Sequence, residues 1–280
     1  MALLGAHVSI AGGLDSAFEH GESIGCQAIQ IFSKNQRQWR DDPLSDDAIS
    51  RFRLRFNQSS IQSVIVHDSY LINLANPDRE LLEKSRNAFQ SEVRRAHQLG
   101  VQYLVLHPGS HLNSGEKVGI KRIAEGINRI LDGMDDSEIS VLFETTAGQG
   151  TSIGGKVAHL RDIIGSIHKR ERVGICIDTA HIFAAGYDIR KIDEYEQLVR
   201  TFDRMIGLTF IRVFHLNDSK SEMGSRVDRH ESIGKGQIGI KPFQYLINDD
   251  RFANCPMILE TPGGPEQYKK DLKMLRSLMI

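Results

Sequence analysis

Histidine and acidic side chains follow a series of short apolar segments along the chain. These segments are rich in Val, Ile and Leu, as expected of buried β-strands. The residues that end six of them are His67, His107, Glu144, Asp178, His215 and Glu260. No Lys or Arg stands beside these six on the predicted strands. Burying them together would leave acids and imidazoles without cationic partners, so the pattern predicts a divalent metal ion.

Two further pairs of metal-binding residue types lie close to these strand ends. His181 follows Asp178 by three residues, and His230 follows Asp228 by two, a spacing that places both side chains on one side of an extended segment. The full set holds five His and four carboxylates, with no Cys. Imidazole mixed with carboxylate favours Zn²⁺, with Mn²⁺ or Fe²⁺ as substitutes, over Mg²⁺ or Ca²⁺. At about three or four ligands per ion, this set predicts two or three ions.

The charge of such a cluster indicates its substrate. Three divalent ions outweigh four ligand carboxylates, so the loaded site would be positive and would attract phosphate. A multinuclear site can also hold a hydroxide and stabilise the leaving oxygen of an in-line displacement. We therefore expect the chain to hydrolyse a phosphoester.

The segments that position these residues alternate predicted strands with helices from end to end. The predicted strands are Leu3–Ser9, Ala28–Phe32, Val64–His67, Tyr103–His107, Ser140–Glu144, Val173–Asp178, Phe210–His215 and Met257–Glu260. Between them lie amphipathic patterns such as 78–99, which is followed by Gly100, a residue suited to a helix C-terminus. Eight strand–helix units in 280 residues match an α/β fold, a single (β/α)8 TIM barrel with the metal cluster at the C-terminal face of its strands. A doubly wound open sheet is the alternative.

The composition is that of an ordinary globular protein and excludes several classes. The net charge is −1, so a nucleic-acid partner would need a local positive patch. No apolar stretch approaches the roughly 20 residues that span a membrane, and the first residues lack the basic segment of a signal peptide. Three scattered cysteines indicate a reducing compartment, so we expect a cytoplasmic protein. No linker divides the chain, which predicts one domain over residues 1–280.

A set of short motifs carries a resemblance to a known family. They are GAHVS (5–9), KNQRQW (34–39), HDSYLINL (67–74), HPGSH (107–111), ETTAGQG (144–150), DTAH (178–181), HLNDSK (215–220), GSRVDRH (224–230) and LET (259–261). Together they resemble the endonuclease IV family, the zinc-dependent apurinic/apyrimidinic (AP) endonucleases of base-excision repair. The resemblance implies a TIM barrel with three zinc ions per chain that acts on duplex DNA containing abasic sites. We expect the chain to be a monomer that binds no membrane.

The resemblance also implies the metal ligands and the reaction. By motif, one zinc is held by His67 and His107, a second by Asp178, His215 and Glu260, and a third by His181, Asp228 and His230, with Glu144 bridging the first two. The implied reaction is hydrolysis of the phosphodiester 5′ to the abasic site, by in-line attack of a metal-bound hydroxide. It leaves a 3′-hydroxyl and a 5′-deoxyribose phosphate. Glu144 or Glu260 would orient the hydroxide or act as the base.

The same comparison implies loops that contact DNA. Arg37, Tyr70 and Leu71 resemble the wedge that the family inserts at the lesion, where unstacking is least costly because a base is missing. Asn35 and Gln36 would line the lesion pocket, and the candidates for phosphate contact are Lys34, Lys220, Arg226 and Arg229.

Three other features lie outside these roles. His7 and His111 carry no implied ligand role, and we expect them to support the ligands. The segment GKGQIG (234–239) follows a polar loop and not a strand, so it predicts no dinucleotide site.

Two other functions fit part of the pattern. A sugar isomerase or epimerase of the same barrel type also places His, Glu and Asp around one or two divalent ions. A small sugar has no need of the trio His181, Asp228 and His230, or of loops that carry Arg37 and Tyr70. A non-catalytic damage-binding protein with structural zinc is disfavoured, because closed structural sites favour Cys-rich ligand sets.

Overall fold

Eight parallel strands close into a barrel in the computed structural model, which describes residues 2–39, 42–134 and 137–280. In chain order the barrel strands are β1 (Leu3–His7), β2 (Ala28–Phe32), β3 (Ser63–His67), β4 (Tyr103–Leu106), β6 (Ser140–Glu144), β8 (Val173–Asp178), β9 (Ile211–His215) and β12 (Pro256–Leu259). Strand β1 pairs with both β2 and β12, which closes the sheet. The predicted (β/α)8 barrel is confirmed, and the open sheet was the wrong alternative.

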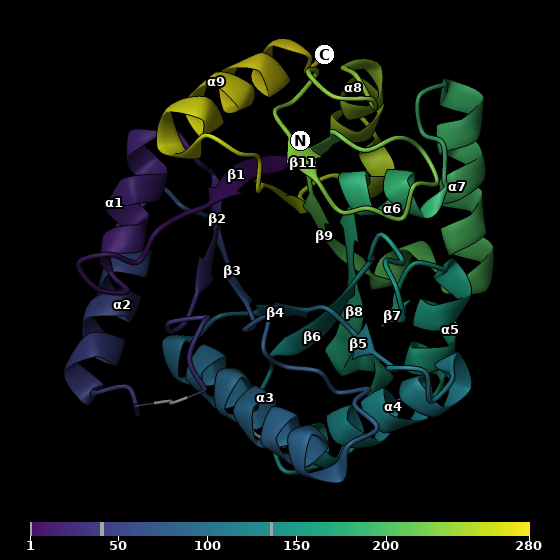
Figure 1. Ribbon diagram of the computed structural model, residues 1–280. Coiled ribbons are helices and arrows are strands. Elements are labelled where there is room, and N and C mark those ends of the chain that lie inside the picture. The colour runs from purple at the N-terminus through teal and green to yellow at the C-terminus, as the bar shows by residue number, and fades with distance from the viewer. Residues whose placement is uncertain (1, 40–41, 135–136) are drawn as a thin grey trace.

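Helices form a ring around the strands (Figure 1). They are α1 (Ser16–Ser23), α2 (Asp46–Gln58), α3 (Arg79–Leu99), α4 (Glu116–Asp132), α5 (Val157–Gly165), α6 (Thr179–Ala185), α7 (Ile192–Met205), α8 (Lys241–Ile247) and α9 (Gly264–Ser277). Three short 3₁₀ helices span Arg170–Arg172, Leu208–Phe210 and Asp250–Phe252. Two small antiparallel pairs complete the described strands: β5 (Gly109–Ser110) pairs with β7 (Ser152–Ile153), which follows α4 and β6 in the chain, and β10 (Asp218–Ser219) pairs with β11 (His230–Glu231) in a hairpin. Within the described ranges, no helix has the length and apolar character needed to cross a bilayer.

The boundaries of the elements follow local chemistry. Helix α3 begins after Asp78, whose Oδ1 accepts the backbone N–H of Leu81 at 2.9 Å, and it ends at Gly100, which has a φ of 74°. Strand β1 stops at His7, two residues earlier than predicted. Strands β4 and β12 each stop one residue earlier than predicted, so His107 and Glu260 begin loops.

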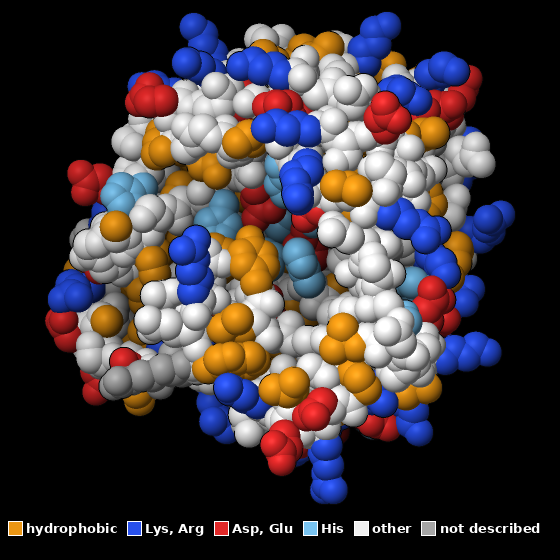
Figure 2. Space-filling view, viewed as in Figure 1, with side chains coloured by type: hydrophobic (Ala, Val, Ile, Leu, Met, Phe, Trp, Pro, Cys, Tyr) orange, Lys and Arg blue, Asp and Glu red, His pale blue; other side chains and the backbone are white. Residues whose placement is uncertain are grey.

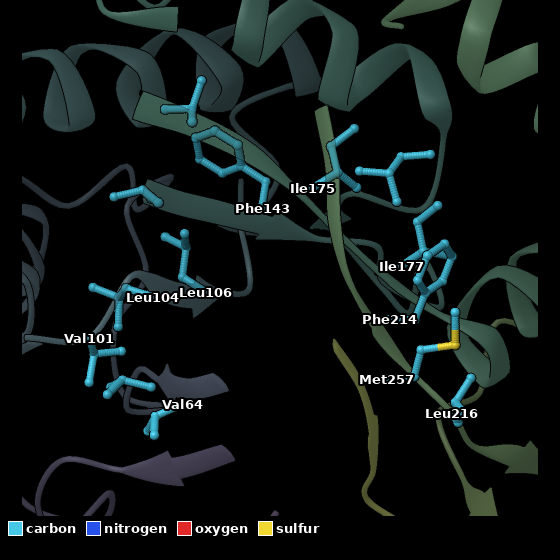
Figure 3. Packing of buried hydrophobic residues seen from close by; sticks show 14 of the residues in the cluster. Val64, Val101, Leu104, Leu106, Phe143, Ile175, Ile177, Phe214, Leu216 and Met257 are labelled. Carbon is cyan, nitrogen blue, oxygen red and sulfur yellow. The ribbon is translucent and has the colours of Figure 1, made fainter. Parts of the chain in front are cut away.

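Alternation of side chains along the strands divides the apolar core into two parts. The side chains that form the small inner cluster are Ala28, Ile65, Val105, Leu142, Cys176, Val213 and Ile258. Neighbouring residues such as Leu104, Phe143 and Ile175 belong to the larger cluster between strands and helices, part of which Figure 3 shows. Because alternate residues of a strand share a face, the residue two positions beyond an inner side chain also faces inward, one layer nearer the mouth.

Candidate metal centre

The six predicted strand-end residues lie one layer above the apolar interior of the barrel. Each follows an inner apolar residue by two positions; the pairs are Ile65 and His67, Val105 and His107, Leu142 and Glu144, Cys176 and Asp178, Val213 and His215, and Ile258 and Glu260. The strand period therefore aims all six side chains into the mouth. Figure 2 shows histidine and acidic side chains gathered in a hollow on this face, with Lys and Arg on the surrounding surface.

Glu144 lies at the centre of the cluster and faces four imidazoles. Its Oε2 lies 3.1 Å from Nε2 of His67 and 3.2 Å from Nε2 of His107. Its Oε1 lies 3.1 Å from Nδ1 of His181 and 3.1 Å from Nδ1 of His215. Each oxygen has its own set of neighbours, which suits a carboxylate that bridges two ions.

The candidate donor atoms form three groups, within each of which they lie no more than 4.8 Å apart. The groups are His67, His107 and Glu144; Glu144, Asp178, His215 and Glu260; and Asp178, His181 and His230. Asp228, expected in the third group, has a side chain that is 42% exposed. Its carboxylate oxygens still lie 3.1 Å from Nε2 of His181 and 3.3 Å from Nε2 of His230. The structure thus brings all nine residues together and adds Asp178 to the third group.

Local structure explains how the later residues reach the mouth. Oδ1 of Asp178 accepts the backbone N–H of His181 at 2.8 Å, so Asp178 caps helix α6. The first turn of that helix then presents His181 to the cluster. The hairpin β10–β11 pairs Ser219 with His230, which holds the loop containing Asp228 against the same face.

Burial and mutual attraction shift the pKa values of the cluster in opposite directions. Burial alone would raise the pKa of Glu144, but His215 and His107 hold it well below its ordinary value. Burial would lower the pKa of His67, but its hydrogen bond to Glu144 raises that pKa to about 9. The same competition, won by neighbouring acidic groups, raises the pKa values of His181 and His215. Without a metal ion, the buried carboxylates therefore favour the protonated forms of His67, His181 and His215.

This donor set fits a divalent cation of the zinc type. In the part of the chain that the structure describes, no Lys or Arg forms an ion pair with any of the nine side chains. Nε2 of His230 is buried without a hydrogen-bond partner and lies 3.6 Å from Asp178. A buried polar atom in this state needs a partner, and a cation held by imidazole and carboxylate would supply it.

The two loops that carry the predicted wedge are joined at the mouth. Oγ of Ser69 donates to the backbone oxygen of Gln36 at 2.6 Å, which ties the loop after β2 to the loop after β3. Tyr70 is 60% exposed, and its ring centroid lies 5.7 Å from that of His67. Tyr70 thus stands between the solvent and the cluster.

The other predicted DNA-contacting residues differ in exposure. Asn35, Arg37, Lys220, Arg226 and Arg229 are exposed, whereas Gln36 and Leu71 are partly buried. Lys34 differs most, because its side chain is only 9% exposed and its Nζ lies 3.5 Å from the buried carboxylate of Glu92. An ammonium held in this way is less available to a DNA phosphate than the exposed arginines are.

A polar cavity of about 540 Å³ opens beside the cluster. Tyr70, His107, His181 and Asp228 line one part of it, and side chains such as Asn73 and Thr151 line the rest. Its volume lies within the range of about 300–1,000 Å³ that is typical of ligand sites.

Sequence reasoning missed two buried amides that contact the candidate ligands. Gln30 hydrogen-bonds to Glu260 and His215. Nδ2 of Asn217 donates to Asp178 at 2.6 Å, and Oδ1 of Asn217 accepts the backbone N–H of Glu260 at 2.9 Å. Amides are not preferred zinc ligands, so a search by ligand type passes over them. The two-residue spacing from the inner residue Ala28 is the signal that could have found Gln30.

His7 and His111, which were expected to support the ligands, have different positions. Nδ1 of His7 lies 3.3 Å from Oε1 of Glu260, where it can support that carboxylate. His111 does not have the expected position, because its Nδ1 accepts the backbone N–H of Gly115 at 3.2 Å within a turn. The ring of His111 therefore caps this turn, and its Nδ1 is not available to the candidate ligands.

Comparisons with known proteins agree with this architecture. A family model described as "Xylose isomerase-like TIM barrel" matches residues 18–278. A protein of Chloroflexus aurantiacus named "Probable endonuclease 4" is 49% identical over 281 aligned positions, covering 100% of this chain and 99% of that protein. The crystal structure of endonuclease IV from Thermus thermophilus aligns with a TM-score of 0.88 at 35% identity over 98% of both chains. A D-tagatose 3-epimerase-like protein aligns with a TM-score of 0.75 at 18% identity over 98% of this chain and 96% of that one, a likeness of fold alone.

The fold and the site therefore define a xylose isomerase-like TIM barrel with a candidate metal centre at its mouth. The sequence relatives and the solved structure together place the chain more closely. It belongs to the endonuclease IV family and is an enzyme of that family.

Proposed function

We propose that this chain is a DNA repair nuclease that hydrolyses the phosphodiester 5′ to abasic sites in duplex DNA, leaving a 3′-hydroxyl and a 5′-deoxyribose phosphate. One observation carries the proposal: eight histidine and carboxylate side chains converge with Glu144, beside a polar cavity and the exposed Tyr70. The names of its relatives, endonuclease 4 and endonuclease IV, support DNA as the substrate.

The proposal includes three zinc ions per chain, with Mn²⁺ as a substitute. His67, His107 and Glu144 would hold one ion, and Glu144 would share a second with Asp178, His215 and Glu260. His181, Asp228 and His230 would hold the third, with Asp178 close to it. When bound, the ions supply Lewis acidity and positive charge for phosphoester hydrolysis.

The two proposed catalytic carboxylates differ in their freedom to take a proton. Glu144 is 1% exposed, and both of its oxygens face imidazoles at 3.1–3.2 Å. Glu260 is 15% exposed. Among the described residues, one imidazole lies close to its Oε2, that of His215 at 3.2 Å. We therefore assign proton acceptance from the attacking water to Glu260, and the bridging role to Glu144.

DNA recognition is assigned to the loops around the mouth. Arg37 and Tyr70 are exposed there, with Leu71 partly buried behind them, and they would fill the gap left by a displaced abasic sugar. The chain as a whole has a net charge of only −1, so DNA binding needs a local group of positive side chains. The exposed Arg226 and Arg229 would supply it by contacting phosphates. Asn35 and Gln36 border a second cavity of about 440 Å³ together with His7 and Phe32, and this cavity would be the lesion pocket that receives the displaced nucleotide.

The remaining expectations belong to the same proposal. We propose that residues 1–280 form one domain, that the protein acts as a monomer and that it works in the cytoplasm. The inner cluster and the closed sheet extend from β1 to β12, which supports a single domain.

A sugar isomerase or epimerase remains the alternative because that class shares the fold. Such an enzyme needs one or two ions at its strand ends. The trio His181, Asp228 and His230 and the exposed Tyr70 favour the nuclease.

An abasic-oligonucleotide nicking assay tests the proposal. A duplex with one abasic site should be cut once, 5′ to that site, and the same duplex with an intact base should not be cut. Extension of the nicked strand by a DNA polymerase would verify the 3′-hydroxyl. A chelator should abolish cutting and added Zn²⁺ should restore it, whereas cutting that persists without metal contradicts the proposal.

A further inference from the structure

The side chain of Gln30 lies in the same layer of the barrel as the candidate ligands, at the position that β2 contributes. It belongs to β2, two residues beyond the inner residue Ala28, and pairs in register with His7 of β1. Its side chain is fully buried, with 0% exposure. A buried amide is costly unless its polar atoms are hydrogen-bonded, so its partners show what the residue is for.

Among the described residues, the hydrogen bonds of this side chain go to the cluster and to His7. Nε2 of Gln30 donates to Oε1 of Glu260 at 2.7 Å and lies 3.0 Å from Nδ1 of His7. Oε1 of Gln30 lies 2.8 Å from Nε2 of His215. The reverse orientation of the amide would set two oxygens against each other at Glu260, so the network fixes the orientation.

This orientation determines which atoms of two neighbours remain available. Because Oε1 of Gln30 can only accept, Nε2 of His215 must carry a hydrogen, and Nδ1 is the nitrogen that faces Glu144 and Glu260 at 3.1 and 3.2 Å. Because Nε2 of Gln30 engages Oε1 of Glu260, the other oxygen, Oε2, is the one that faces His215.

We infer that Gln30 is a positioning residue that selects one nitrogen of His215 and one oxygen of Glu260 as donors, and thereby sets the affinity of the group Glu144, Asp178, His215 and Glu260 for its ion. The inference rests on the proposed function, because it assigns an ion to that group. It acts through hydrogen bonds to the outer side of the ligands, which orient them and tune their basicity. The other two groups have no hydrogen bond to Gln30 among the described contacts.

The test measures metal binding rather than catalysis. Gln30→Met keeps length and approximate volume but removes the donor and the acceptor. The control is Ser33→Ala, directly after the same strand, which removes a buried hydrogen bond of 2.6 Å to Glu92 on the opposite side of the sheet. Zn²⁺ affinities come from competition with a chelating dye, stoichiometry from elemental analysis, and site geometry from the absorption bands of the Co²⁺-loaded protein.

Gln30→Met should lower the affinity for one Zn²⁺ ion by about tenfold or more and alter the absorption bands of Co²⁺ bound at that position. The affinities for the other ions should not change. Ser33→Ala should lower the melting temperature with unchanged metal affinities. If Gln30→Met does not fold, Gln30→Asn replaces it, since the shorter amide cannot span both neighbours and should show the same loss. Equal affinities and spectra in wild type and variant would overturn the inference. A wild-type chain that binds no ion would instead overturn the proposed function.

Discussion

The carboxylate of Asp218 accepts the backbone N–H of Gly236 at 3.0 Å. It also accepts the N–H groups of Ser219, Ile238 and Gly239 at 2.7, 2.9 and 3.3 Å. The glycine-rich segment 234–239 therefore wraps around a carboxylate of its own chain, which engages the N–H groups of Gly236, Ile238 and Gly239. Asp218 belongs to β10, so this loop also supports the hairpin that carries His230.

Substitution at Gly236 should test that support. A Cβ there would overlap the backbone oxygen of Ser219 and the carboxylate of Asp218. We expect Gly236→Ala to lower the free energy of unfolding by about 1–3 kcal/mol. It should also lower the affinity for the ion held by His181, Asp228 and His230 more than the affinities for the other ions. Denaturant unfolding and metal titration measure the two effects. Gly165→Ala is the control, because a Cβ at Gly165 meets no atom within 4 Å.

Elemental analysis should find about three zinc ions per chain, as expected for nine donors at three or four per ion. Removing the ions should lower the melting temperature, since a ligand that binds only the folded state stabilises it by about 2.7 kcal/mol at 100 times its Kd. Re-addition of Zn²⁺ should restore both stability and nicking. One ion per chain, or none, would contradict the trinuclear assignment.

Replacing Glu260 separates binding from chemistry. We expect Glu260→Gln to keep the fold and the affinity for abasic DNA, because the amide keeps the shape of the carboxylate. Cleavage should fall by about 10²–10⁴-fold, the usual contribution of a general base. Single-turnover nicking, a gel-shift assay and elemental analysis for zinc make the comparison, so that loss of the general base is distinguished from loss of an ion. Full activity would remove Glu260 from the mechanism.

Arg37 should affect recognition more than chemistry. Its side chain is exposed on the loop tied to Ser69, so Arg37→Ala should leave the melting temperature unchanged. We expect the preference for abasic over intact duplex to fall by about tenfold, the equivalent of about 1.4 kcal/mol. Arg170→Ala serves as the control, because Arg170 is an exposed arginine that precedes β8 at the opposite end of the barrel. An unchanged preference in Arg37→Ala would exclude the wedge assignment.

Asp249 makes the free energy of unfolding depend on pH, and this effect does not involve the candidate metal centre. Burial would raise its pKa, but hydrogen bonds from Arg251 and from Tyr195 hold it below its ordinary value. A lowered pKa stabilises the fold above the unfolded value of about 3.9, and this stabilisation is lost as the pH falls through the folded pKa. We expect Asp249→Asn to cost about 1 kcal/mol at pH 7. In denaturant unfolding the difference from wild type should shrink below about pH 4, whereas the exposed Asp203→Asn should show no comparable loss at pH 7.

Most of the barrel could be predicted because its strands repeat one pattern, an apolar run that ends in a polar residue. Ile65 followed by His67 and Leu142 followed by Glu144 are examples, and the two-residue period states which way the polar side chain faces. The antiparallel pair β5–β7 and the hairpin β10–β11 could not be predicted, since pairs of only two residues depend on tertiary contacts and not on local propensity.

Parts of the site depended on neighbours that are distant in sequence. The ion pair that holds Lys34 to Glu92 joins residues from two separate elements, and no local pattern reveals it. The sequence did not predict a role for Gln30 or Asn217, because each acts through its hydrogen bonds to candidate ligands and is not itself a preferred ligand type. Asp178 was expected in one group of ligands and lies in two, because its Oδ2 lies 3.9 Å from Nδ1 of His215 and 3.6 Å from Nε2 of His230.

Pairing between β1 and β12 has a consequence for biosynthesis. Leu3 aligns with Pro256, and Ala6 with Leu259, so the first strand made is joined to the last. A nascent chain on the ribosome cannot close the sheet until residue 259 has left the exit tunnel, and Glu260 follows it. The newly made protein is therefore unable to assemble its full set of donors until residue 260 has been translated and has emerged.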